Sequence, residues 1–158
     1  MIVLGLLCAA TAANGQVVAL GASNTAGKGV SSQDAYPAQL EAMLRAKGFA
    51  VTVANAGVSG DTTAGMLTRL DSAVLQGTRV VILQPGGNDR GVASSVPQIL
   101  ARVHAKGIKV VMVENSMIAA IPAPMHQPDR IHLTAEGYHL LAVRLLPRVA
   151  SALGSSRR

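Results

Sequence analysis

Short apolar runs alternate along the chain with longer segments of mixed polarity. Four such runs lie at residues 17–20, 51–54, 80–83 and 110–113, and glycine, proline or polar residues bound them. None shows the polar alternation of a strand with one face in water. We therefore expect four strands that are buried on both faces of a sheet.

The segments between these runs carry apolar residues at helical spacing. Helices are predicted at about 36–47, 61–76 and 95–106, with Asp61 as the expected cap of the second. A last helix follows Thr134, and its apolar stripe is Tyr138, Leu141, Leu145 and Val149. Single helices between buried strands predict βαβ units. The fold class is therefore α/β, a parallel sheet between two layers of helices.

Three loops rich in small residues follow the first three strands, at residues 21–29, 55–60 and 85–91. The carboxyl ends of parallel strands meet at one edge of the sheet, where α/β proteins place their sites. We therefore expect any chemistry of this chain at that edge.

Composition adds three limits. The 158 residues fit one domain, and 49% hydrophobic against 14% charged residues allow a large buried core. The formal net charge is +6, but the basic residues are scattered and form no stripe with stacking aromatics, which argues against a nucleic-acid partner. Cys8 is the only cysteine, so an internal disulfide and a thiolate metal site are both excluded.

The opening residues 1–13 are apolar and end in small residues, as the core and cleavage zone of a signal peptide do, although a basic leading region is absent. We expect these residues to be a signal peptide and residues 14–158 to be the domain. The protein would then be periplasmic or secreted, and cytoplasmic otherwise. The run is too short to span a bilayer, and no stable membrane span is expected.

The first loop reads GASNTAGKG at residues 21–29. A phosphate-binding P-loop would need four residues between its first glycine and Gly-Lys, followed by Ser or Thr. Here five residues intervene and Gly29 replaces the hydroxyl residue. The alternative is a nucleophilic Ser23 on a tight turn directly after a central strand.

A serine nucleophile needs a base, and the base needs an orienting group. His132 lies three residues after Asp129, which allows the carboxylate to accept from the imidazole Nδ1 while Nε2 faces the serine. His126 lies three residues before Asp129, and spacing alone does not exclude it. His104 and His139 fall within predicted helices and are expected on the surface or in packing.

Acyl transfer also needs donors for the developing oxyanion. Gly60 can offer a backbone N–H beside a substrate, and Asn88 can offer a side-chain amide. Asp61 and Asp89, which adjoin these two residues, are expected to cap a helix and a loop rather than to catalyse.

The ordered set of Ser23, Gly60, Asn88 and Asp129-x-x-His132 resembles the SGNH hydrolases, also called the GDSL family. The branch of bacterial thioesterase I, arylesterase and lysophospholipase is the most similar. The motifs that carry the resemblance are NAGVSGDTT at 55–63, GGND at 86–89 and QPDRIH at 127–132.

The resemblance implies Ser23 as nucleophile, His132 as general base and acid, and Asp129 as the group that orients His132. It implies an oxyanion hole from the Ser23 amide, the Gly60 amide and the Asn88 side chain, with no cofactor and no metal. The implied fold is three-layer α/β/α, with a flavodoxin-like parallel sheet of four to five strands in the order 2-1-3-4.

Two departures from the family pattern change the expectations. Ala22 stands where the family has Asp, which predicts altered support of the serine loop rather than loss of activity. Only about fifteen residues separate Val113 from Asp129, where relatives usually fit a helix and a fifth strand. We expect four strands and an open site, with residues 114–128 too short for a helical lid. A partner subunit could then cover the site over the apolar run 117–121.

The sequence thus predicts a cofactor-free serine esterase or thioesterase that cleaves short-chain acyl esters through an acyl-enzyme. Its partner is a small-molecule acyl ester or thioester, and a homo-oligomer is left open. Three alternatives remain: a carbohydrate acetylesterase with the same residues, a nucleotide-binding α/β protein, and an inactive binding module that kept the fold.

Overall fold

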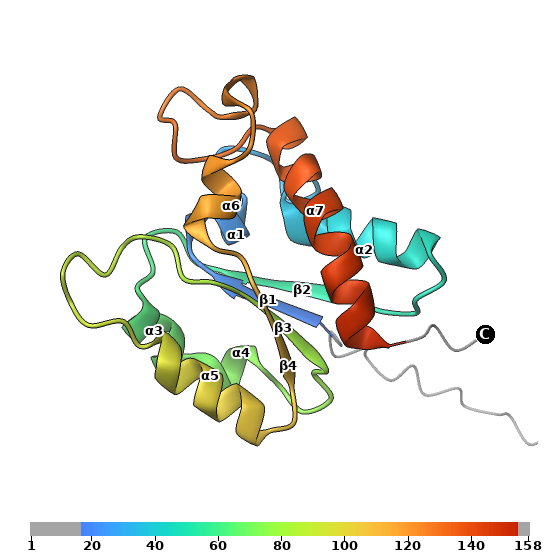
Figure 1. The fold of residues 1–158 in the computed structure, drawn as a ribbon, viewed down its shortest axis with the longest axis vertical. Coiled ribbons are helices and arrows are strands. Elements are labelled where there is room, and N and C mark those ends of the chain that lie inside the picture. Colours follow the sequence, from blue (N-terminus) through green and yellow to red (C-terminus); the bar gives the residue numbers. More distant parts are fainter. Residues whose placement is uncertain (1–16, 155–158) are drawn as a thin grey trace, which may run out of the picture.

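The structure is a computed structural model that describes residues 17–154, and a parallel sheet lies at its centre (Figure 1). The strands are β1 (Val17–Gly21), β2 (Val53–Gly57), β3 (Val80–Gln84) and β4 (Lys109–Met112). They hydrogen-bond in the order β2-β1-β3-β4, and every pair is parallel. The predicted strand order and four-stranded parallel sheet are confirmed. The residues expected to form a signal peptide lie outside the described part.

Helices cover both faces of the sheet, so the fold has three layers (Figure 1). One layer contains α2 (Tyr36–Ala46) and α7 (Ala135–Leu153). The other contains α3 (Thr63–Thr68), α4 (Leu70–Ala73) and α5 (Val96–Ala105). Three short elements complete the chain: α1 (Ser23–Ala26), α6 (Asn115–Ala119) and η1 (Ala123–Met125).

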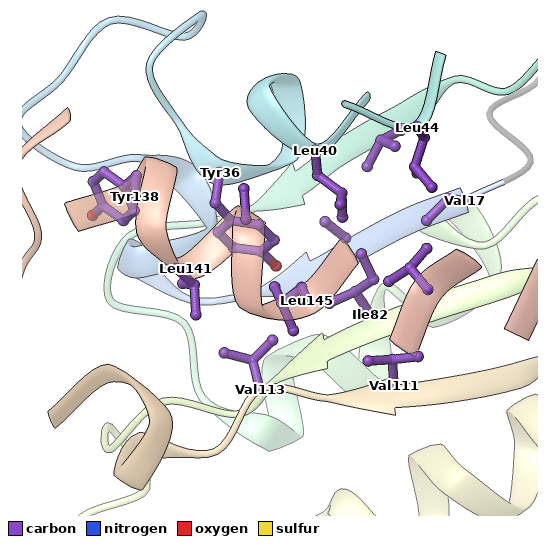
Figure 2. Packing of buried hydrophobic residues seen from close by; sticks show 14 of the residues in the cluster. Val17, Tyr36, Leu40, Leu44, Ile82, Val111, Val113, Tyr138, Leu141 and Leu145 are labelled. Carbon is purple, nitrogen blue, oxygen red and sulfur yellow. The ribbon is translucent and has the colours of Figure 1, made fainter. Parts of the chain in front are cut away.

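The core has two parts because successive side chains of a strand point to opposite faces. In β1, Val17 and Ala19 belong to the cluster under α2 and α7, whereas Val18 and Leu20 belong to the cluster under α3, α4 and α5. All five residues of β1 are buried, which is why the strand reads as a continuous apolar run. Figure 2 shows the first cluster, where Tyr36 and Tyr138 reach in from the two helices.

Two elements differ from the prediction. The second strand begins at Val53 rather than at 51, because its ladder with β1 pairs Val17 with Val53 and Gly21 with Gly57. Backbone pairing thus extends the strand through polar and small residues that read as loop. The helix expected at 61–76 is two helices that meet at Arg69, and Thr62, rather than Asp61, is the cap whose side chain accepts from Gly65 N–H.

The short connection after β4 leaves no fifth strand in the described residues, as expected, but it does form a helix. Helix α6 lines the same cavity as Ser23 through Asn115, Ile118 and Ala119, so residues 114–128, which were expected to be too short for a helical lid, do supply a short helix to the wall of the site. Ile118 and Ile121 are buried in the core of the chain itself. The run 117–121 therefore does not offer these isoleucines to a partner subunit.

Candidate active site

The serine loop is a tight turn between β1 and the short helix α1. Ser23 is the first residue of α1, two positions after the strand ends at Gly21. A Cβ on Gly21 would lie 2.2 Å from Thr25 Oγ1, and one on Gly57 would lie 2.1 Å from the Ala26 nitrogen. Glycine is thus required at the ends of β1 and β2, because α1 packs directly on their backbone.

The buried side chain of Gln84, at the end of β3, holds this turn in place. Its Oε1 accepts from the Ala22 N–H and from the Thr25 hydroxyl, both at 3.1 Å. The hydroxyl oxygen of Tyr36 lies 3.3 Å from Thr25 Oγ1. Burial raises the pKa of the Tyr36 hydroxyl well above its usual range, so this hydroxyl remains protonated. The loop that lacks the family's Asp at position 22 is therefore supported through the backbone of Ala22.

Backbone bonds within the loop also argue against a phosphate-binding loop. The amides of Thr25 and Ala26 donate to the Ala22 carbonyl, and the amide of Lys28 donates to the Ser23 carbonyl. With the Ala22 amide bonded to Gln84, these N–H groups are not turned toward an anion as a phosphate cradle requires.

The Ser23 hydroxyl donates to Nε2 of His132, with an oxygen–nitrogen distance of 2.8 Å. The other ring nitrogen of His132, Nδ1, donates to Oδ2 of Asp129 at 2.5 Å. The structure thus brings together the three residues predicted as nucleophile, base and orienting acid. His132 is 6% exposed, so its ring is largely shielded from water, whereas Ser23 lines the cavity.

Asp129 holds its place through the backbone that follows it. Its Oδ1 accepts from the N–H of Ile131 at 2.9 Å and from the N–H of His132 at 3.0 Å. Hydrogen bonds hold the pKa of this carboxyl well below its usual range. The largest effect comes from the backbone N–H of His132, followed by the His132 ring and then the N–H of Ile131. The orienting group is therefore an ionised carboxylate.

The structure distinguishes His132 from His126, which spacing did not. The His126 ring bonds through Nε2 to the Ile121 carbonyl at 3.0 Å and does not contact Ser23. His139 bonds to Gln39 on the surface, and His104 lies exposed on α5. His126 is nevertheless part of the wall of the cavity at Ser23.

Two of the three predicted oxyanion donors lie in the cavity at Ser23, which has a volume of about 460 Å³. Asn88 lines it, and its amide nitrogen also donates to the Asp61 carbonyl at 2.8 Å. Within residues 17–154 the N–H groups of Ser23 and Gly60 have no bonded acceptor. Gly60 lies in the turn after β2 with φ 82°, adjacent to the residue that holds Asn88, but it is not among the lining residues.

Asp61 and Asp89 bond to neighbouring structural groups, although Asp61 is not the helix cap that was expected. Asp89 accepts from the N–H and the hydroxyl of Thr63 at the start of α3, each at 2.8 Å. Asp61 pairs with Arg69 at 2.8 Å, and Arg69 also donates to the Gly21 carbonyl. This chain of contacts joins the Asn88 loop to the end of β1.

Asn24 was not predicted from the sequence, yet it ties the serine helix to the histidine loop. Its amide nitrogen donates to the Ile131 carbonyl at 3.2 Å, and its oxygen accepts from the Tyr138 hydroxyl at 3.1 Å. Burial raises the pKa of Tyr138 to about 12, so it stays a donor. The only sequence signal was the position of Asn24 directly after the candidate nucleophile.

Neither a metal site nor a membrane span is found in the described part. Residues 17–154 contain no group of three or more His, Cys, Asp or Glu side chains that could hold a metal ion. Among the helices of that same stretch, none combines the length and the apolar character needed to cross a bilayer.

The family model for the GDSL-like Lipase/Acylhydrolase family matches residues 19–127. An arylesterase of Vibrio mimicus is 33% identical over 116 residues, which cover 68% of this chain and 58% of the Vibrio protein. Esterase TesA of Pseudomonas aeruginosa is 33% identical over 105 residues, which cover 61% of this chain and 52% of TesA. The chain thus spans just over half the length of these two relatives.

Solved structures of esterases share the fold. A crystal structure of TesA superposes with a TM-score of 0.70 at 25% identity, covering 87% of this chain and 97% of that one. Esterase EstA from Pseudoalteromonas sp. gives a TM-score of 0.73 at 16% identity, covering 88% and 98% of the two chains. At 16% identity the second likeness shows the fold alone.

Proposed function

The chain belongs to the GDSL-like lipase/acylhydrolase family, and we propose that it hydrolyses carboxylic esters through an acyl-enzyme formed on Ser23. One observation carries the proposal: the Ser23 hydroxyl lies 2.8 Å from His132 Nε2, while Nδ1 of the same ring lies 2.5 Å from an ionised Asp129. A base within hydrogen-bond reach of the nucleophile, itself oriented by a carboxylate, is the arrangement that activates a serine.

The proposed reaction follows from these positions. Ser23 Oγ attacks the ester carbonyl carbon while His132 Nε2 takes the hydroxyl proton. The imidazolium that forms is stabilised by Asp129, and it returns the proton to the leaving alkoxide as the tetrahedral intermediate collapses. Water then enters and attacks the acyl carbon while His132 removes its proton. As the second tetrahedral intermediate collapses, the bond to Ser23 Oγ breaks, His132 returns the proton to Oγ, and the carboxylic acid is released.

The negative charge on the carbonyl oxygen needs donors that are already in position. We assign this role to the N–H of Ser23, the N–H of Gly60 and the amide of Asn88. The two backbone groups have no other bonded acceptor in residues 17–154, and the Asn88 amide is oriented by the Asp61 carbonyl. Donors fixed before the reaction are effective because they need no reorganisation as charge develops.

We further propose short acyl esters, and thioesters of the same acyl groups, as the substrate class. The cavity at Ser23 has few apolar walls, namely Ala22, Ile118, Ala119 and Ile131, among a majority of polar lining residues. Ile131 is 61% exposed and offers little burial to an alkyl chain. A thioester fits the same mechanism because the oxyanion and the nucleophile are unchanged and only the leaving atom differs.

The test is labelling with a fluorophosphonate, which reacts with activated serines, followed by peptide mapping. We expect one modified residue, Ser23, and turnover of p-nitrophenyl acetate that disappears on labelling. Ser31, an exposed serine bonded to Asp34, is the internal control and should stay unmodified. Labelling of another serine, or no labelling together with no ester turnover, would contradict the proposal.

A further inference from the structure

Two arginines line the cavity at Ser23 and have no role in the mechanism above. Arg90 lies in the loop after β3, two residues beyond Asn88, and Arg130 lies between Asp129 and His132. Both contribute to the wall of the 460 Å³ cavity, and both are exposed. Arg90 comes from the loop between β3 and α5, and Arg130 comes from the loop between η1 and α7.

These two arginines differ from the others in what their guanidinium groups contact. The remaining six arginines of residues 17–154 donate to a carboxylate or to a backbone carbonyl; they are Arg45, Arg69, Arg79, Arg102, Arg144 and Arg148. Within the same residues, no acceptor is bonded to the side chain of Arg90 or Arg130. The unpaired guanidinium groups are therefore concentrated at the candidate active site.

No acidic side chain that lines the cavity is available to neutralise them, because none of its lining residues is Asp or Glu. The acids closest in the chain are bonded to other groups: Asp89 accepts from Thr63, Glu114 accepts from Ser116, and the ionised Asp129 beside Arg130 accepts from His132 and Ile131. Concave sites lined by one sign of charge focus the field and raise the local concentration of counter-ions.

The backbone at both positions is costly for a side chain. Arg90 has φ 46° and Arg130 has φ 57°, and they are the only residues other than glycine in 17–154 with positive φ. Glycine would adopt this left-handed conformation without a steric penalty. Strained backbone tends to occur at functional sites, so two strained positions that both carry arginine at one cavity point to a use for the side chains.

We propose that Arg90 and Arg130 form an anion-binding subsite that selects esters bearing a carboxylate, sulfonate or phosphate group on the acyl side or on the leaving group. The inference rests on the proposed ester hydrolysis and names the substrate class of that same site. The guanidinium fork of arginine matches the paired oxygens of such anions. The anion can belong to the acyl group or to the leaving group, and the test separates the two.

The test uses two matched pairs of esters. For the acyl side, the mono-p-nitrophenyl ester of adipic acid is compared with p-nitrophenyl hexanoate, which has the same chain length and no charge. For the leaving-group side, p-acetoxybenzenesulfonate is compared with p-(methylsulfonyl)phenyl acetate. The full chain is assayed as wild type, Arg90→Gln, Arg130→Gln and the double variant. Lys47→Gln removes the same charge as a control, because Lys47 is exposed at the end of α2 and does not line the cavity.

Comparing each variant with wild type on the same ester cancels differences in intrinsic reactivity. We expect each arginine variant to lower kcat/KM for the anionic ester of one pair by about tenfold more than for its neutral partner, as loss of a charge-assisted bond does. Added salt should reduce kcat/KM of wild type for that anionic ester alone, because exposed charges are screened. Lys47→Gln should change none of these ratios.

The outcomes separate the two proposals. Turnover of all four esters with equal losses for charged and neutral partners in both pairs would overturn the subsite and leave the ester hydrolase standing. An equal loss in Lys47→Gln would also overturn the subsite, since net charge alone would then explain the effect. No turnover of any of the four esters by wild type would overturn both.

Discussion

Replacing Asp129 by asparagine should abolish most of the ester turnover while leaving the fold intact. The reason lies in the two backbone donors on one side of the carboxylate. Oδ1 accepts from the N–H groups of Ile131 and His132 at 2.9 and 3.0 Å. In Asp129→Asn the amide oxygen must occupy the position of Oδ1. An NH₂ group there would leave the N–H groups of Ile131 and His132 without an acceptor, at a cost of about 1–3 kcal/mol each.

The asparagine NH₂ group would then lie where Oδ2 now lies, 2.5 Å from His132 Nδ1 in the present structure. It can bond to Nδ1 only as a donor, so the ring proton moves to Nε2, which faces the Ser23 hydroxyl. A protonated Nε2 cannot accept the serine proton. For a buried orienting acid the same exchange costs roughly 10⁴-fold in kcat. The Asp129 side chain is 41% exposed, so water can assist the ring, and we expect a loss of about 10³-fold.

The assay is kcat/KM on p-nitrophenyl acetate together with the rate of fluorophosphonate labelling, since both depend on the same proton transfer. Asp71→Asn is the control, because Asp71 pairs with Arg102 and Lys106 away from the site. The thermal unfolding midpoint at neutral pH should change little, since the loop bonds are kept. An Asp129→Asn enzyme within about tenfold of wild type would refute the tautomer argument.

The depressed pKa of Asp129 also fixes the sign of a pH effect on stability. The ionised form is favoured in the folded state, so its contribution to the free energy of unfolding is present above the unfolded pKa of about 3.9 and is lost as pH falls below it. The difference in unfolding midpoint between wild type and Asp129→Ala should therefore shrink in acid. A difference that grows as pH falls would contradict the assigned direction.

Three further predictions concern the site, and one concerns the opening residues 1–13. His132→Ala should lower kcat by about 10³-fold or more and His126→Ala by little; the reverse ranking would mean that the wrong histidine is assigned. Asn88→Ala should cost about 10²- to 10³-fold in kcat, and an unchanged kcat would remove it from the oxyanion hole. A fully buried methylene contributes about 0.8 kcal/mol, or fourfold in kcat/KM. Because the cavity has few apolar walls, we expect kcat/KM for acyl esters to be flat or falling beyond hexanoyl, and a steady rise to dodecanoyl would refute this. We propose export with cleavage near Ala13, and an intact amino terminus in mass spectra of the native protein would contradict it.

Reactive residues with a recognisable spacing could be predicted from the sequence. Residues that support the site through hydrogen bonds to distant parts of the chain could not. Ser23, Asp129 and His132 stand out because their residue types are reactive and two of them are three residues apart. Gln84 does not stand out, because its bond to the Ala22 amide spans 62 residues and needs the pairing of β1 with β3 to exist. Asn24 is similar, since its partner Ile131 is 107 residues away.

The fold, like the site, was predicted where the local sequence pattern is clear and missed where distant contacts determine the structure. Strand β1 and the first four residues of β3, Val80 to Leu83, are apolar and were found from the pattern. Strand β2 was displaced because beyond Val53 its residues are not buried, and only hydrogen bonding to β1 makes them a strand. At the break between α3 and α4, Arg69 contacts Asp61 and the Gly21 carbonyl, and no local sequence pattern predicts these contacts.

The hydrogen bonds of Asn24 with Ile131 and Tyr138 have a consequence for when the site forms during synthesis of the chain. A chain leaving the ribosome carries Ser23 more than a hundred residues before His132, and amino-terminal parts tend to fold first. Until α7 docks and Tyr138 meets Asn24, the serine has no base and stays an ordinary hydroxyl. The nascent chain is therefore expected to expose no reactive nucleophile, and the proposed ester hydrolysis can begin only after α7 has packed against the rest of the domain.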